Sequence, residues 1–86
     1  MTSADKLARQ ILFVRADANV DFADLRKFLL SLGFVERVRG SHHLFVKAGV
    51  EELLNLQRDG KHAKPYQVRQ VRMMVMRHHL WNPDHE

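Results

Sequence analysis

A Gly-Ser pair between two strand-like runs is the feature that most restricts how this chain can fold. In residues 34–39 (FVERVR), apolar and charged residues alternate in part and two of the side chains are β-branched. Residues 42–47 (HHLFVK) are aromatic and apolar. Gly40-Ser41 between them has the glycine-first pattern of a two-residue type II′ turn, which joins antiparallel strands. The sequence therefore predicts a β-hairpin over residues 34–47.

A third strand is predicted after the hairpin, over residues 50–57 (VEELLNLQ). Its Glu and Leu residues favour a helix, but the segment between Gly49 and the next charged stretch is short for one. Residues 58–64 (RDGKHAK) are expected to form a basic loop around an Asp-Gly turn. Together these segments predict a three-stranded antiparallel meander.

Three helices are predicted to pack on one face of this sheet. The first covers residues 3–15, the second begins after the N-cap Asp21 and ends at the C′ residue Gly33, and the third begins with Pro65. The order helix, helix, three strands, helix predicts an α+β fold in a single domain of 86 residues. The predicted buried stripes are Leu7, Ile11 and Val14, then Phe22, Leu25, Leu29 and Leu32, and finally Val68, Val71 and Val75.

The charge of the chain is uneven. Fourteen Lys and Arg residues against ten Asp and Glu give a net charge of +4, and residues 34–80 alone hold nine basic and four acidic residues. A positive second half suits a polyanion such as nucleic acid, and it also suits an ordinary solvated surface. The sequence has no cysteine, no signal-peptide core and no apolar run long enough to span a bilayer. We therefore expect a cytoplasmic protein with no membrane partner.

His42 and His43 follow the turn directly and, as neighbours in a strand, are expected to point to opposite faces of the sheet. A histidine here is either a strand-edge residue with a satisfied hydrogen bond or a group that takes and returns a proton, because the ordinary imidazole pKa is about 6.5. The six histidines match no zinc-ligand spacing, and the sequence has no Gly-rich phosphate loop or nucleophile-elbow motif. Neither a metal nor a cofactor is expected.

Basic residues gather around the start of the last predicted helix, at Lys61, Lys64, Arg69 and Arg72. Free backbone N–H groups at a helix start attract anions, so this cluster is suited to grip phosphates; the alternative is a solvated charged face. Tyr66 is placed either to stack on a nucleic-acid base or to be buried with its hydroxyl at the rim.

Two stretches of the chain resemble the HicA family of toxins from bacterial type II toxin–antitoxin pairs. They are LGFVERVRGSHHLFVK at residues 32–47 and LNLQRDGKHAKPYQVRQVR at residues 54–72, and the resemblance extends over residues 20–80. It implies a double-stranded-RNA-binding-like fold of α-β-β-β-α type. It also implies an mRNA interferase activity, which stops translation until a HicB-like antitoxin protein covers the site.

The resemblance divides the chain and assigns the site. Residues 1–19 form an N-terminal helical extension, residues 20–80 the HicA-like RNA-binding and ribonuclease domain, and residues 81–86 a C-terminal tail. The family's catalytic histidine directly follows the Gly-Ser or Gly-Gly turn, which implies that His42 is catalytic, that Gly40 and Ser41 present it, and that His43 packs. Lys61 and Lys64 match the family's positive loop only loosely. The candidate RNA-binding residues are Arg39, Lys61, Lys64, Tyr66, Arg69 and Arg72.

Three functions of different classes follow as hypotheses. The first is a metal-independent endoribonuclease that uses His42 as the general base on a ribose 2′-OH. The second is a non-catalytic RNA-binding module that contacts the RNA backbone through the same basic surface. The third is a protein-interaction domain whose positive face binds an acidic partner.

Overall fold

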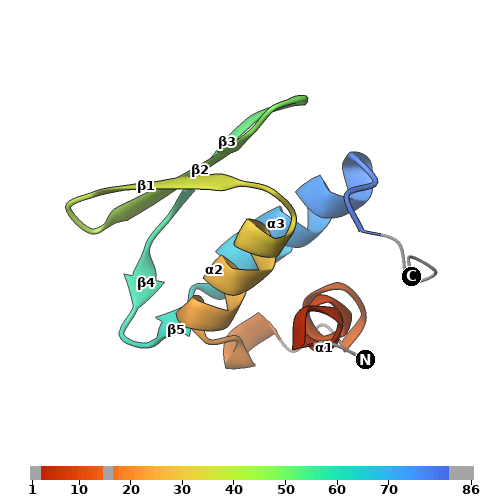
Figure 1. Ribbon diagram of the computed structural model, residues 1–86. Coiled ribbons are helices and arrows are strands. Elements are labelled where there is room, and N and C mark those ends of the chain that lie inside the picture. The colour runs from red at the N-terminus through yellow and green to blue at the C-terminus, as the bar shows by residue number, and fades with distance from the viewer. Residues whose placement is uncertain (1–2, 15–16, 82–86) are drawn as a thin grey trace.

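The computed structural model describes residues 3–14 and 17–81. A three-stranded antiparallel sheet lies across helices α2 (Phe22–Ser31) and α3 (Pro65–Arg77), and the N-terminal segment packs on the other side of these helices (Figure 1). The predicted α+β class with a three-stranded antiparallel sheet is confirmed. The strands of the sheet, in the order β1-β2-β3, are β1 (Val35–Arg39), β2 (His42–Lys47) and β3 (Val50–Leu56).

The predicted hairpin is present with the expected turn. Arg39 pairs with His42 across the turn, and Gly40 has a φ of 59°, whereas Ser41 keeps the negative φ of a type II′ turn. The third strand is also confirmed, although the register between β2 and β3 shifts between Phe45 and Lys47. The sheet buries one face only, so its two faces carry different side chains.

Helix α2 begins and ends where the sequence indicates. Asp21 is the N-cap residue, but its side chain makes no capping hydrogen bond. At the other end Gly33 has a φ of 96°, and the N–H of Phe34 donates to the carbonyl of Leu29 over 3.2 Å, which is the long bond of a Schellman motif. Phe22, Leu25 and Leu29 are buried as predicted; Phe28 is buried too, whereas Leu32 is only half-buried.

The N-terminal segment differs from the predicted regular helix. Helix α1 (Ser3–Arg9) continues as a π-helical turn over Gln10–Val14, and a 3-10 turn follows at Asp17–Asn19. A π turn widens the helix and rotates the face that points inward. The buried residues are therefore Ala8, Ile11 and Leu12, while Leu7 is half-buried; the predicted third member, Val14, has its side chain outside the described part of the chain.

The segment expected to be a basic loop, residues 58–64, is a second small hairpin. Strands β4 (Arg58–Asp59) and β5 (His62–Ala63) pair around Gly60-Lys61, another glycine-first turn with a φ of 60° at Gly60. The hairpin is held at the start of α2, where the N–H of Phe22 donates to the carbonyl of Lys61 over 2.9 Å. Strands of two residues each show no periodicity, which is why the sequence predicts only a loop.

Helix α3 buries Val68, Val71 and Val75 as predicted. It ends at Arg77, and the chain then turns at His79, whose φ of 53° is left-handed. The sequence assigns Trp81 to the tail, but its ring packs against that of Phe13 with the centroids 5.8 Å apart. Burial of the large indole against the N-terminal segment explains the difference. The rest of the predicted tail, residues 82–86, lies outside the described residues.

Within the described segments, no helix is long and apolar enough to cross a membrane.

Candidate active site at the turn end of the sheet

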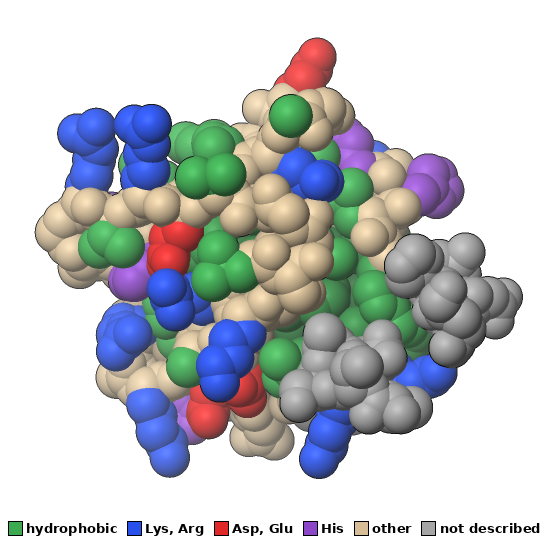
Figure 2. All heavy atoms as spheres, in the orientation of Figure 1, with side chains coloured by type: hydrophobic (Ala, Val, Ile, Leu, Met, Phe, Trp, Pro, Cys, Tyr) green, Lys and Arg blue, Asp and Glu red, His purple; other side chains and the backbone are tan. Residues whose placement is uncertain are grey.

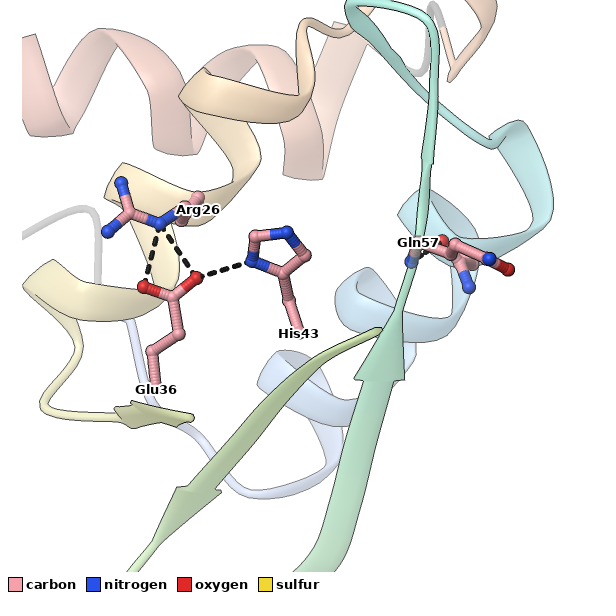
Figure 3. Close-up of polar contacts among 5 residues, drawn as sticks. Arg26, Glu36, His43 and Gln57 are labelled. Atoms are coloured by element: carbon pink, nitrogen blue, oxygen red, sulfur yellow. Dashed lines mark hydrogen bonds and ion pairs between the residues drawn. The ribbon is translucent and has the colours of Figure 1, made fainter. Parts of the chain in front are cut away.

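The two adjacent histidines lie on opposite faces of β2, as the alternation of a strand predicts. His43 faces the helices: its ring contacts the ring of Phe22 edge to face with centroids 4.8 Å apart. Its Nδ1 lies 2.8 Å from Oε2 of Glu36, which also receives a hydrogen bond from Nε of Arg26 over 2.7 Å (Figure 3). His43 is therefore a packed residue that ties the sheet to α2.

Glu36 is an ionised group held in this contact. Only 9% of its side chain is exposed, and the hydrogen bond from Arg26, followed by the one from His43, lowers the pKa of this carboxyl group below its usual range. A lowered carboxyl pKa in the folded protein means that ionised Glu36 stabilises the fold.

We expect Glu36→Gln to lower the free energy of unfolding by about 1–2 kcal/mol near pH 7, because charge-assisted hydrogen bonds are removed. The contribution is fully present above the ordinary Glu pKa of about 4.3 and is lost as the pH falls through the lowered pKa of the folded protein. Thermal unfolding of parent and variant should therefore converge at acid pH. Glu51→Gln, at an exposed site on β3, is the control; a constant gap between parent and Glu36→Gln at every pH would contradict the assignment.

His42 lies exposed on the outer face of the sheet, away from the helices. Its Nδ1 is 3.0 Å from Oδ1 of Asn55 on β3. Asn55 pairs with Leu44, the residue two positions beyond His42 on the same face of β2. The imidazole is thus open to solvent and held by one neutral partner.

A second polar contact fixes the turn that precedes His42. Nε2 of Gln57 donates to Oγ of Ser41 over 2.8 Å, and Nζ of Lys64 donates to Oε1 of Gln57 over 3.5 Å. Arg39 pairs with His42 across the hairpin, so their side chains share the outer face. His42 therefore has one cation, Arg39, on the neighbouring strand. A second cation, Lys64, bonds to Gln57, which in turn bonds to the turn residue Ser41.

The outer face of the sheet combines this charge with exposed apolar groups. Basic side chains stand on the outer side near the β1–β2 turn, and apolar side chains lie beside them (Figure 2). The apolar groups include Val35, Val46 and Leu53, which are 58%, 42% and 52% exposed. Such a mixed face suits either an extended polyanion or a protein partner.

Other predicted RNA-binding residues lie along the β4–β5 hairpin and the start of α3. Lys61 is exposed in the turn between β4 and β5. Tyr66 is 55% exposed, and its hydroxyl accepts a hydrogen bond from Nε2 of Gln67 over 3.4 Å. Arg69 is exposed on α3 with its guanidinium 3.8 Å from the carboxylate of Asp17. These side chains remain accessible to a ligand.

The structure does not favour the prediction that Arg72 binds RNA, because its side chain is buried. Arg72 is 7% exposed, its Nε donates to the carbonyl oxygen of Ile11 over 2.8 Å, and its guanidinium forms an ion pair with Asp17. The cation therefore joins α3 to the N-terminal segment, and it is buried there. Arg72 lies four residues after Val68 and three before Val75, so it belongs at the edge of the buried stripe. The sequence-based prediction followed the basic charge of this region instead.

The sequence did not single out Asn55, Gln57 or Gln67, and the structure brings all three to the site. Gln67 is 4% exposed; its Oε1 accepts from the N–H of Gln57 over 3.1 Å and its Nε2 donates to the carbonyl of Asn55 over 3.2 Å. Asn55 lies on the outer face of β3, and Gln57 directly follows the last residue of that strand. The register between β2 and β3 shifts between Phe45 and Lys47, so strand alternation alone does not show which residues of this segment reach the turn.

Across the described residues, no three His, Asp or Glu side chains gather as metal ligands would. Comparisons with protein-family models, with curated proteins and with solved structures found no match for this chain.

Proposed function

We propose that this protein is a metal-independent endoribonuclease of the HicA type, with His42 as the general base. The observation that carries the proposal is an exposed imidazole at a tight turn, paired through Nδ1 with Asn55 and flanked by Arg39. Its neighbour His43 is packed on Phe22 and bonded to Glu36, so His42 is the member of the pair that a substrate can reach. The resemblance to HicA toxins supplies the same residue independently.

The reaction would proceed on an RNA strand lying across the outer face of the sheet. The ribose 2′-oxygen bonds to the adjacent phosphorus while its proton passes to Nε2 of His42, and the bond from phosphorus to the 5′-oxygen breaks. The leaving oxygen takes a proton from water, which gives a 2′,3′-cyclic phosphate and a 5′-hydroxyl end. In this proposal Arg39, opposite His42 on β1, and Lys64, bonded to Gln57, would stabilise charge on the phosphoryl oxygens.

The order of elements supports a double-stranded-RNA-binding-like fold for this proposal. Helix α2, strands β1 to β3 and helix α3 follow one another as α-β-β-β-α, with the β4–β5 hairpin and the N-terminal segment as additions. The proposed partners are mRNA and a HicB-like antitoxin protein in the cytoplasm. The exposed valines and leucine beside the cations would give such a protein an apolar contact over the site.

Incubation of a labelled RNA with the purified protein in EDTA tests the proposal. We expect cleavage without a divalent cation. RNA that is retained in a salt-dependent manner but stays intact would indicate a non-catalytic RNA-binding module instead. A protein that neither cleaves nor retains RNA would fit the protein-interaction domain.

If the β4–β5 turn and the start of α3 contact the RNA backbone, the double variant Lys61→Ala/Lys64→Ala should bind every RNA sequence more weakly. The log-log dependence of binding on salt should become shallower by about 0.7 for each phosphate that the variant no longer neutralises. Lys6→Ala/Lys27→Ala removes the same charge from exposed positions on other elements and should leave the slope nearly unchanged. Equal slopes for both double variants and the parent would remove Lys61 and Lys64 from the interface.

A further inference from the structure

We infer that Asn55 is a positioning residue, which holds the ring of His42 in the tautomer and orientation that leave Nε2 free to accept a proton. The inference rests on the proposed function of His42 and assigns a role to a side chain that is otherwise an exposed asparagine on the outer face of β3.

The geometry of the pair dictates the tautomer. Oδ1 of Asn55 lies 3.0 Å from Nδ1 of His42, and an amide oxygen can only accept a hydrogen bond. Nδ1 of the neutral ring therefore carries the proton, and the lone pair that a general base needs is on Nε2.

The backbone of Asn55 is itself held by a buried side chain of α3, Gln67. Gln67 of α3 bonds to the carbonyl of Asn55 and to the N–H of Gln57, on both sides of the fully buried Leu56. This double contact fixes the end of β3 against α3. The end of β3 thus presents Asn55 to His42, and the residue after the strand, Gln57, contacts Ser41.

The hydrogen bond between His42 and Asn55 adds little to the stability of the fold, because both side chains are exposed and compete with water. A role in orientation predicts instead a change in the state of the ring. Two variants separate the possibilities: Asn55→Leu removes the acceptor at similar size, and Asn55→Asp keeps an acceptor oxygen in its place.

Long-range proton–nitrogen NMR correlation on the labelled full chain reports which ring nitrogen of His42 carries the proton. At about pH 8.5, well above the ordinary histidine pKa of about 6.5, the parent and Asn55→Asp should show the proton on Nδ1. Asn55→Leu should shift it toward Nε2, and Asn19→Leu, a change at another exposed asparagine, should leave it unchanged. The same ring pattern in Asn55→Leu as in the parent would overturn the inference.

RNA cleavage by the same variants gives the second readout. We expect Asn55→Leu to lower kcat about tenfold with KM nearly unchanged, less than loss of the base itself, and Asn55→Asp to recover most of the rate. A shifted tautomer with an unchanged kcat would overturn the positioning role. If the parent cleaves no RNA, the proposed function fails, while the NMR spectra still decide whether Asn55 orients His42.

Discussion

Replacing Arg72 by methionine is expected to lower the free energy of unfolding by about 3 kcal/mol, the low end for breaking a buried ion pair. Methionine keeps much of the volume of the side-chain stem but removes the guanidinium. Asp17, with a side chain 15% exposed, then loses its close partner, and the carbonyl of Ile11 loses its donor. Because these bonds join α3 to the N-terminal segment, that segment should also exchange its amide hydrogens faster.

Chemical denaturation of Arg72→Met and Arg69→Met measures this effect with a matched control. Arg69 faces the same carboxylate at 3.8 Å, but its side chain is 55% exposed, so its removal should cost less than about 0.5 kcal/mol. Equal stability losses for the two variants would contradict the buried role of Arg72. So would an Arg72→Met protein that is as stable as the parent but binds RNA more weakly.

His42→Ala is expected to slow RNA cleavage at least about a hundredfold, the lower end of what one positioned general base contributes. The variant should fold normally, because His42 is exposed and its hydrogen bond to Asn55 lies in water. It should still bind RNA, since the cations of the surface remain. Induced in cells, it should no longer arrest growth.

His43→Ala is the matched comparison, one residue along the same strand. It should act through stability, with a loss of about 1–3 kcal/mol, because it removes the ring packed on Phe22 and the partner of Glu36. At a temperature where the variant is folded, its cleavage rate should approach that of the parent. Cleavage rates and thermal unfolding of both variants give the answer; a rate loss in His43→Ala that matches the loss in His42→Ala would contradict the division of roles.

The parts of the fold that were predictable are those coded by neighbouring residues. The Gly40-Ser41 turn and the strands beside it are coded locally, and so are the ends of α2, where Gly33 supplies the left-handed residue. The π-helical turn at Gln10–Val14 was not predictable, because the apolar residues of this segment also fit the 3.6-residue period of a regular helix. The burial of Arg72 depends on Asp17, which is 55 positions away in the sequence.

The candidate site divides in the same way. The opposite faces of His42 and His43 follow from strand alternation alone, and the structure agrees with it. The partner of His42 does not follow from strand alternation. Asn55 comes from β3, and the register between β2 and β3 contains an irregularity. The role of Gln67 could not be predicted from local pattern, since it requires the distance between α3 and the end of β3.

Cleavage of an RNA with one altered sugar tests the central claim most directly. The bond cut by the parent protein in EDTA is first mapped in an all-ribose strand. The nucleotide on the 5′ side of that bond is then replaced by its 2′-deoxy form. If His42 activates the 2′-hydroxyl, the all-ribose strand yields a fragment ending in a 2′,3′-cyclic phosphate and the altered strand stays intact there. Cutting of the altered strand at the same position, or a requirement for a divalent cation, would contradict the account.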